Sequence, residues 1–257
     1  MNQPVAIRPD GTRRAETRVW VPEVPVALEF NGLSYAVMMA SPQDLEDFAT
    51  GFALNEGLAA NSCEVTDFAI AEVEQGWIVR AALSGLGIEK LTERVRNRVA
   101  ESSCGLCGIE NLAEVARPLP PVAPHSAITA PVIFAALAAL REHQPLGRKT
   151  GAAHAAAFVT PDGVIGLVRE DVGRHNAMDK LTGAMARAGQ ALSPGFMLST
   201  ARCSFEIVEK AVRAGASTLV TVSLPTSLAV ERAKTAGLSL WVLARDDAVT
   251  LVNDASA

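Results

Sequence analysis

The sequence predicts an α/β protein in which helices pack on a layered, partly parallel β-sheet, preceded by a smaller N-terminal α+β unit. From residue 154 onward, short apolar runs of strand length alternate with amphipathic segments of helix length, as in a sheet covered by helices. Before them, the proline-rich stretch "ARPLPPVAPHSAITAPV" marks a change of unit. We therefore expect a flexible arm over residues 1–18, an α+β domain over residues 19–125 that carries a cysteine loop, and a layered domain over residues 126–257.

The first expected elements are a hairpin and a helix. The hairpin covers residues 24–39 and turns at Asn31-Gly32, a dipeptide suited to a type I′ turn. The helix lies within residues 41–57, with Ser41 as its cap and Gly57 as its stop. The remaining expected elements are strands at 77–83, 196–200, 218–222 and 238–245, two strands within 154–170, and helices at 87–100, 131–143, 174–189, 204–215 and 226–237.

Composition excludes several classes of function. The chain has 257 residues, 49% of them hydrophobic, so it can bury a full core. Its net charge of −5 offers no basic surface of the kind that binds nucleic acid. No apolar run approaches the roughly 20 residues of a membrane span, and the first 18 residues lack the apolar core of a signal peptide. We expect a cytoplasmic protein that binds neither nucleic acid nor membrane.

The segment "ESSCGLCGIENL" holds Cys104 and Cys107 among serine and glycine residues. A structural zinc site needs four ligands, whereas Cys63 and Cys203 stand alone and the four histidines are scattered, so no metal ligand is assigned. A thioredoxin-like redox pair begins a helix after a strand, whereas this pair follows an expected helix. Exposed, closely spaced thiols ionise and react readily. The residues favour a carrier thiol, with a zinc site, a redox pair and a buried pair as the alternatives.

Polar loops at the ends of expected strands suit an anionic ligand, because helix N-termini present free N–H groups and a positive dipole end. In an open α/β sheet, such loops converge on the ligand. The competing interpretations are a solvated helix start, a helix cap at Asp171 and a core histidine. The candidate residues are His154, Gly173, Arg174, His175, Asn176, Pro225, Thr226 and Ser227.

The order of two of these loops resembles that of zinc-dependent nucleoside deaminases, which carry H-x-E on one loop and P-C-x-x-C on a later one. Here the loops read His154-Ala155-Ala156 and Pro225-Thr226-Ser227-Leu228. Alanine replaces the general-acid glutamate, and neither zinc cysteine is present. We therefore expect a deaminase-like scaffold without deaminase chemistry.

Taken together, the motifs resemble the FdhD family, sulfurtransferases that serve formate dehydrogenase maturation. The resemblance covers nearly all of the chain after residue 20. It rests on "NGLSYAVMMASPQDLEDFATGFALNEG", "SSCGLCG", "TGAAHAAAF", "REDVGRHNAMDKLTG", "SFEIVEKA" and "LPTSLAVERAKTAGLSLWVLAR". It implies a cytidine-deaminase-like fold for the second domain and a homodimer.

The resemblance also implies a function. A cysteine desulfurase would load a persulfide onto Cys104, assisted by Cys107, for transfer to the molybdenum or tungsten of a bis(molybdopterin guanine dinucleotide) cofactor, with formate dehydrogenase as the client. The order of the two thiols stays open. GDP or GMP is the expected mimic of the bound cofactor, and a non-enzymatic chaperone that only holds the cofactor is the alternative function. The family's cofactor-binding segment falls on Leu243, Ala244, Arg245, Asp246, Asp247 and Ala248.

Two positions depart from the family pattern. Thr200-Ala201 stands where Ser-Gly is expected, and Leu224 stands where alanine is usual. Both positions are expected near the pocket, whereas the cysteine pair is unchanged.

Overall fold

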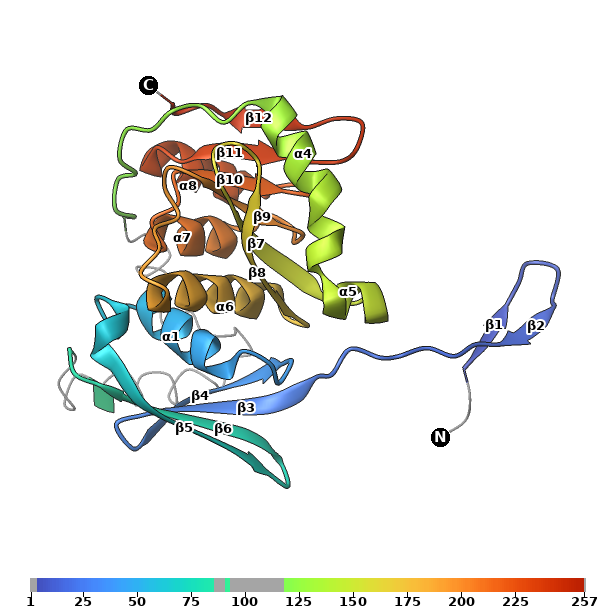
Figure 1. The fold of residues 1–257 in the computed structure, drawn as a ribbon, viewed down its shortest axis with the longest axis horizontal. Helices are drawn as coiled ribbons and strands as arrows, with labels where there is room; N and C mark the ends of the chain where they lie inside the picture. Colours follow the sequence, from blue (N-terminus) through green and yellow to red (C-terminus); the bar gives the residue numbers. More distant parts are fainter. Residues whose placement is uncertain (1–3, 86–90, 93–117, 257) are drawn as a thin grey trace.

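The computed structural model describes residues 4–85, 91–92 and 118–256 of the chain. These residues form a six-stranded sheet in the order β12-β11-β10-β9-β7-β8, a four-stranded sheet in the order β4-β3-β6-β5, and the two-stranded hairpin β1-β2 (Figure 1). The strands are β1 (Val5–Ile7), β2 (Arg13–Ala15), β3 (Val24–Phe30), β4 (Leu33–Ala40), β5 (Val65–Val73), β6 (Gly76–Leu83), β7 (His154–Val159), β8 (Ile165–Asp171), β9 (Phe196–Ser199), β10 (Thr218–Thr221), β11 (Ser239–Val242) and β12 (Thr250–Asn253). The helices are α1 (Leu45–Asn55), α4 (Ala130–Leu140), α5 (Pro145–Thr150), α6 (Arg174–Arg187), α7 (Phe205–Arg213) and α8 (Ser227–Ala236), with short 3-10 turns at Ser62–Glu64 and Arg141–His143.

The N-terminal unit confirms the expected hairpin. Asn31 and Gly32 both have positive φ, 50° and 78°, as a type I′ turn requires. The expected arm is not devoid of structure, because β1 and β2 pair within it. The expected helix at residues 87–100 lies outside the described residues except for Leu91 and Thr92.

The cap expected at Ser41 is wrong. Helix α1 begins at Leu45, and its N-cap is Asp44 in the left-handed conformation. The Ser41 hydroxyl instead donates to the Pro22 carbonyl at 2.9 Å. Ser41, which the local sequence pattern assigns to the N-terminus of this helix, makes a tertiary hydrogen bond instead.

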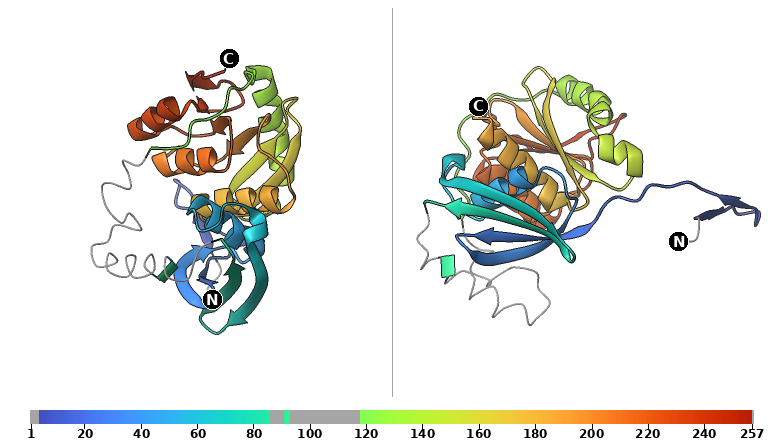
Figure 2. Two further views of the ribbon diagram at one scale, coloured as in Figure 1. Left: turned by 90° about the vertical axis from the view of Figure 1, so that its left-hand side faces the viewer. Right: turned by 60° about the horizontal axis from the view of Figure 1, so that its bottom comes forward.

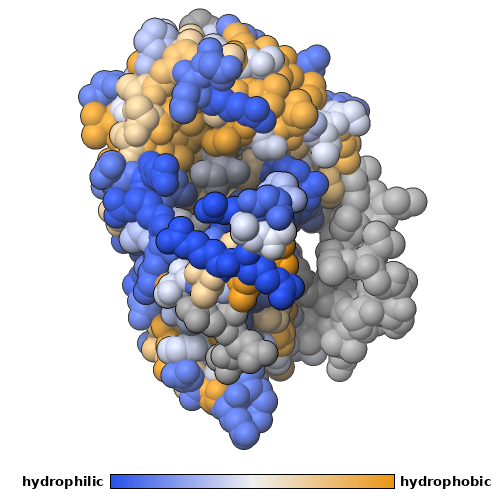
Figure 3. All heavy atoms as spheres, turned by 90° about the vertical axis from the view of Figure 1, so that its right-hand side faces the viewer, coloured by the Kyte–Doolittle hydropathy of each residue, from blue (hydrophilic) through white to orange (hydrophobic). Residues whose placement is uncertain are grey.

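The six-stranded sheet is partly parallel, as expected, because β9, β10 and β11 run in the same direction. Strands β7 and β12 run antiparallel to β9 and β11, respectively. Side chains alternate between the two faces: Ala156, Met197, Leu219 and Leu240 pack against α6, α7 and α8. Their neighbours Ala157, Leu198, Val220 and Trp241 face the side of α4. Helix α4 is apolar throughout, and Figure 3 shows hydrophobic residues gathered over the upper part of the face on which it lies.

Helices α1 and α6 cross at a glycine on each helix and so join the two units (Figure 1). A Cβ atom on Gly51 would stand 1.7 Å from the Asp179 carbonyl oxygen, and one on Gly183 would stand 1.9 Å from the Asp47 carbonyl oxygen. No real contact is that short, so only glycine permits the backbones to approach this closely. The spacing of the two units depends on this pair of glycines.

A buried ion pair fastens the same junction. Lys180 and Asp171 are both fully buried, and Lys180 Nζ lies 2.6 Å from Asp171 Oδ2. Lys180 also donates to the Ser41 carbonyl at 2.8 Å, and the Ser41 N–H donates to Asp171 at 3.0 Å. Removing one partner of a buried pair typically costs about 3–5 kcal/mol, because the other charge is left without compensation. The chain before α1 is therefore tied to β8 and α6.

We predict that Gly183→Ala destabilises the protein, although Gly→Ala inside a helix ordinarily adds roughly 0.5–1 kcal/mol of stability. The added methyl group would meet the backbone of α1, so we expect a loss of at least about 1–3 kcal/mol, the usual cost of overpacking. Urea unfolding followed by circular dichroism measures the change. Ala186→Gly, on the same helix, is the control and should cost only the propensity difference. A Gly183→Ala variant as stable as the parent would contradict the close crossing.

Candidate functional site

One edge of the six-stranded sheet collects the loops named from the sequence. The carboxyl ends of β9, β10 and β11 share this edge, because these strands are parallel. Strand β7 runs the opposite way, so its first residue, His154, lies at the same edge and pairs with Asp171, the last residue of β8. The segments starting at Gly173, Pro225 and Leu243 follow β8, β10 and β11 at this edge. The alternation of side chains then divides the edge into two clusters, one on each face.

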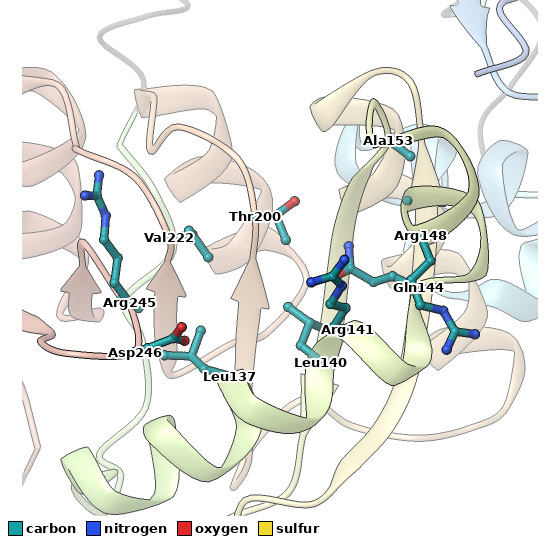
Figure 4. A pocket seen from close by; sticks show the side chains of 13 residues that line it. Leu137, Leu140, Arg141, Gln144, Arg148, Ala153, Thr200, Val222, Arg245 and Asp246 are labelled. Carbon is teal, nitrogen blue, oxygen red and sulfur yellow. The ribbon is translucent and has the colours of Figure 1, made fainter. Parts of the chain in front are cut away.

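The first cluster lines a cavity of about 620 Å³ on the face of α4 and α5 (Figure 4). Arg141 and Arg148 contribute to its lining from the helical side and Arg245 from the segment after β11, and in Figure 4 the guanidinium groups of Arg148 and Arg245 point away from each other. The lining holds three arginines and one carboxylate, that of Asp246. Arg148 Nη1 also lies 3.6 Å from Glu142 Oε2, but arginines still outnumber carboxylates, and the positive balance suits an anionic ligand. The complete lining is Leu137, Leu140, Arg141, Gln144, Gly147, Arg148, Gly151, Ala153, Thr200, Val222, Ala244, Arg245 and Asp246.

Glu170 holds α5 at this cavity. Its carboxylate is buried and accepts the N–H groups of Leu146 and Gly147 at 2.8 and 2.7 Å. These donors belong to the first turn of α5, where free N–H groups favour a carboxylate. The end of β8 thereby positions the helix that carries Arg148.

The second cluster lies on the face of α6 and α7, where His154, Arg174, His175, Arg202 and Glu206 come together. His175 Nε2 lies 3.0 Å from Glu206 Oε2. The adjacent His175 side chain lowers the pKa of Glu206 below its usual range, so this carboxylate stays ionised. Burial lowers the pKa of His154, and the nearby charges of Arg174 and Arg202 add to the effect. The cluster therefore combines a neutral histidine, a histidine–carboxylate pair and two arginines.

Unpartnered polar atoms point to a ligand at the second cluster. Arg174 Nε and Ser204 Oγ are buried and have no hydrogen-bond partner among the described residues. Buried polar atoms nearly always have a partner, so each such exception calls for an explanation. An anion with several oxygen atoms would satisfy both a guanidinium N–H and a hydroxyl.

The two cysteines of the sequence motif, Cys104 and Cys107, lie outside the described residues. Of the other two, Cys63 is exposed and Cys203 is buried. Burial raises the pKa of Cys203 to about 12, so its thiol stays protonated and unreactive. Across residues 4–85, 91–92 and 118–256, no three histidine, cysteine or carboxylate side chains are grouped closely enough to hold a metal ion. In the same part of the chain, no helix is long and apolar enough to cross a membrane.

A model of the FdhD/NarQ family matches residues 21–256 of the chain. The chain belongs to the FdhD/NarQ family. The motif resemblance noted in the sequence is thereby confirmed at the level of the family.

Curated relatives of this FdhD/NarQ protein carry the name sulfur carrier protein FdhD. The relative from Cupriavidus necator is 46% identical over 218 residues, which cover 85% of this chain and 76% of the relative. The relative from Variovorax paradoxus is 45% identical over 233 residues, covering 90% and 84%, respectively. A crystal structure assigned to a formate dehydrogenase accessory protein from Desulfotalea psychrophila aligns with a TM-score of 0.75 at 24% identity, covering 99% of this chain and 96% of that one. The last comparison supports the fold alone.

Of the residues proposed for cofactor binding, the structure brings only Ala244, Arg245 and Asp246 to the cavity of this FdhD/NarQ protein. His154, Arg174 and His175 form the second cluster instead. Leu243, in the left-handed conformation, and Asp247 and Ala248 are not part of the cavity lining, although the Ala248 carbonyl accepts the Arg245 N–H at 2.9 Å and closes their turn.

Several other candidates have structural contacts. Asn176 is buried and donates to the Met39 carbonyl and to Asp171 Oδ1, so it serves the junction between the units and not the cavity. The Gly173 N–H donates to the same Asp171 oxygen at 2.7 Å.

The loop before α8 is also outside the cavity. Thr226 caps α8 by accepting the Ala229 N–H at 3.2 Å, Pro225 forms a bridge with Cys203, and Ser227 is the exposed first residue of the helix. The helix N-terminus expected to bind an anion is thus satisfied in part by its own cap.

The sequence interpretation missed Arg141, Gln144 and Arg148. A signal was present, because "REHQPLGRK" follows an apolar segment of helix length and contains four basic residues, Arg141, His143, Arg148 and Lys149. Of the two positions that depart from the family pattern, Thr200 lines the cavity, and its hydroxyl accepts the Ala155 N–H at 2.9 Å. Leu224 is 62% exposed and lies outside the lining.

We predict that His154 makes stability dependent on pH. The folded state holds the pKa of His154 below the ordinary histidine value of 6.5, so below that pH the unfolded chain binds the proton more readily. The parent should therefore lose stability as the pH falls from 7.5 to 5.5, and His154→Gln should lose less. Urea titrations at several pH values measure the difference, with His143→Gln, an exposed histidine, as the control. Identical pH profiles for His154→Gln and the parent would contradict the assignment.

Proposed function

We propose that this FdhD/NarQ protein is a sulfur carrier in the maturation of a formate dehydrogenase. The observation that carries the proposal is the identity of 41–46% with curated relatives named sulfur carrier protein FdhD, together with the cysteine pair of the sequence. The donor would be a cysteine desulfurase and the client a formate dehydrogenase. We expect the protein to act in the cytoplasm as a homodimer.

The chemical step proposed for the donor is thiol–persulfide exchange. The Cys104 thiolate attacks the terminal sulfur of the desulfurase persulfide, and the desulfurase cysteine leaves as a thiolate. Cys107 could then attack Cys104 Sγ, forming a disulfide and releasing hydrosulfide, with a dithiol reductant needed to restore both thiols. Alternatively, Cys104 passes its sulfur on directly while Cys107 assists.

The proposed sulfur acceptor is the molybdenum or tungsten of a bis(molybdopterin guanine dinucleotide), bound as substrate. Each guanine dinucleotide carries a pyrophosphate. The arginines of the cavity suit it, because one guanidinium group can donate two parallel hydrogen bonds to two phosphate oxygens. Arg141, Arg148 and Arg245 are the proposed partners. Arg174 and Ser204 offer further unpaired donors at the second cluster.

For the six-stranded unit we keep the proposal of a cytidine-deaminase-like scaffold, supported by helices on both faces of a partly parallel sheet. Ala156 is fully buried in the core, so it cannot take the place of a catalytic glutamate. The proposal therefore concerns the scaffold and not the deaminase reaction.

The cysteine variants distinguish the carrier from a protein that only holds the cofactor. We predict that Cys104→Ala retains GDP affinity but leaves formate dehydrogenase unsulfurated and inactive in cells that express only the variant. Formate oxidation and cyanide-releasable sulfur in the purified dehydrogenase are the measurements. Cys63→Ala, which removes an exposed thiol elsewhere, is the control. Full dehydrogenase activity with Cys104→Ala would favour the holding function.

Mass spectrometry decides the order of the thiols. After incubation with a desulfurase and cysteine, we expect a mass increase of one sulfur atom on the peptide at Cys104. A persulfide found only on Cys107 would reverse the assignment.

The cavity variants test the cofactor site. A hydrogen bond to a charged group contributes about 1.5–3 kcal/mol, so Arg245→Ala should weaken GDP binding roughly 10-fold to 100-fold. Arg141→Ala should act in the same direction, because both arginines line the cavity. Isothermal titration calorimetry measures the affinity, with Arg213→Ala, an exposed arginine on α7, as the control. Unchanged affinity in both cavity variants would place the nucleotide elsewhere, with Arg174→Ala as the next variant to compare.

A further inference from the structure

Helices α6 and α7 begin next to each other, at the second cluster. The two helices lie side by side on one face of the six-stranded sheet (Figure 2). His175 belongs to the first turn of α6 and Glu206 to the first turn of α7, and His175 Nε2 lies 3.0 Å from Glu206 Oε2. A helix N-terminus presents free N–H groups and the positive end of the helix dipole. Two such ends therefore meet at one point of the sheet edge.

Neither of these helix starts is capped by a side chain. Asp171, whose charge Lys180 balances, accepts the N–H of Gly173, which lies one residue before α6. The N–H groups of the first turn itself have no acceptor among the described residues. Helix α8 differs, because Thr226 caps it by accepting the Ala229 N–H. The starts of α6 and α7 thus keep hydrogen-bond donors that an anion could use.

Buried side-chain atoms without hydrogen-bond partners lie at the same point. Ser204 is the N-cap residue of α7, a position where a serine hydroxyl ordinarily accepts an N–H of the first turn. Here the Ser204 hydroxyl accepts none, and its buried oxygen has no other hydrogen-bond partner within the described residues. Arg174 Nε is buried and unpartnered in the same way, and His175 Nε2 is a third such atom, although Glu206 is its close neighbour. Because an unpaired buried polar group costs free energy, their gathering at one point favours a ligand that accepts their hydrogen bonds.

The net charge of the cluster is positive. Arg174 and Arg202 form no ion pair with any carboxylate of residues 4–85, 91–92 and 118–256. After burial, these two arginines are the main influences that lower the pKa of His154. Arg174 also lowers the pKa of Glu206, less than the adjacent His175 does, so its guanidinium group lies close to both side chains. Two guanidinium groups against one carboxylate suit an anionic ligand.

We propose that an oxyanion of the phosphate class binds at the second cluster, between the first turns of α6 and α7. Arg174 and Arg202 bind its oxygen atoms, the Ser204 hydroxyl donates one hydrogen bond to it, and the free N–H groups of the two first turns supply the others. The oxyanion is either a free ion or a phosphate group of the proposed dinucleotide substrate, because both present the same tetrahedral set of oxygen atoms.

This site is separate from the arginine cavity. None of Arg174, Arg202 and Ser204 belongs to the cavity lining. The two sites lie on opposite faces of the same sheet edge, so each chain has two places for anionic groups. The proposal does not rest on the sulfur-carrier function, because it depends only on the contacts and charges at the two helix starts.

A phosphate titration of the full-length chain, followed by NMR, tests the site. ¹⁵N-labelled protein in phosphate-free buffer is titrated with sodium phosphate, with sodium chloride at matched ionic strength as the reference. We expect saturable changes in the amide resonances of His175 and Glu206, and none at Ser227, which begins the capped helix α8. Absence of a saturable change at both His175 and Glu206 would overturn the proposal.

Arginine variants and GDP sharpen this test. Arg174→Ala should weaken phosphate binding roughly 10-fold to 100-fold, because a hydrogen bond to a charged group is lost, whereas Arg213→Ala, on the exposed side of α7, should leave the affinity unchanged. Unchanged affinity in Arg174→Ala would refute the site. Phosphate binding that persists in saturating GDP identifies the ligand as a free ion, and displacement of phosphate by GDP identifies it as a phosphate group of the dinucleotide.

Ser204→Ala tests the hydroxyl separately. In phosphate-free buffer this variant should melt at the temperature of the parent or above it, because the hydroxyl has no partner to lose. Its phosphate affinity should fall by about 2-fold to 10-fold, the effect of one uncharged hydrogen bond. Thr226→Ala is the matched control, since it removes a hydroxyl that caps α8, and it should lower the melting temperature. A Ser204→Ala variant destabilised as much as Thr226→Ala would show that the hydroxyl has a partner within the protein, and would contradict the proposal.

Discussion

The crossing of α1 and α6 is the contact on which the rest of the structure depends. Because Gly51 and Gly183 let the two backbones touch, α6 is shared between the core of the C-terminal unit and the interface with the N-terminal unit. The middle of α6 is tied through Lys180 to Ser41 in the other unit. Its first residues, Arg174 and His175, belong to the second cluster. Any shift of one unit relative to the other would therefore move α6 and change the geometry of the sheet edge that carries both candidate clusters.

The alternation of side chains along the β-strands divides the candidate site into two clusters, one on each face of the sheet. Sequence alone assembled the strand-end residues into one site, but adjacent residues of a strand point to opposite faces. Ala153 and Thr200 therefore face the cavity, whereas His154 faces α6 and α7. The cavity holds more arginine than acid, while Glu206 partly neutralises the second cluster. The two faces of one edge thus offer different electrostatic environments within a short distance.

Most of the helices and central strands could be predicted, because their apolar periods are long and regular. Strands β5 and β12 escaped detection because they lie at sheet edges, where "VTDFAIAEV" and "TLVN" have no strict alternation of buried residues. The cap assigned to Ser41 failed because its hydroxyl is engaged in tertiary contacts: it donates to the Pro22 carbonyl and accepts the N–H of Val172, 131 residues away. Arg141 and Arg148 escaped for a related reason: they reach the strand ends from the helical layer, a contact that only the packing of α4 and α5 reveals.

The arginines divide into those that form ion pairs with carboxylates between the two units and those at the sheet edge that do not. At the junction of the units, Arg169 and Arg187 pair with the carboxylates of Asp47 and its neighbours on α1. At the sheet edge, by contrast, Arg141, Arg174, Arg202 and Arg245 form no ion pair with any carboxylate of the described residues. The chain has more carboxylates than lysines and arginines, with a net charge of −5. These arginines are therefore unpaired for a reason other than a lack of carboxylates. Their mutual repulsion is a cost that a bound anion would relieve, and this is the electrostatic argument for a phosphate-bearing ligand at this edge.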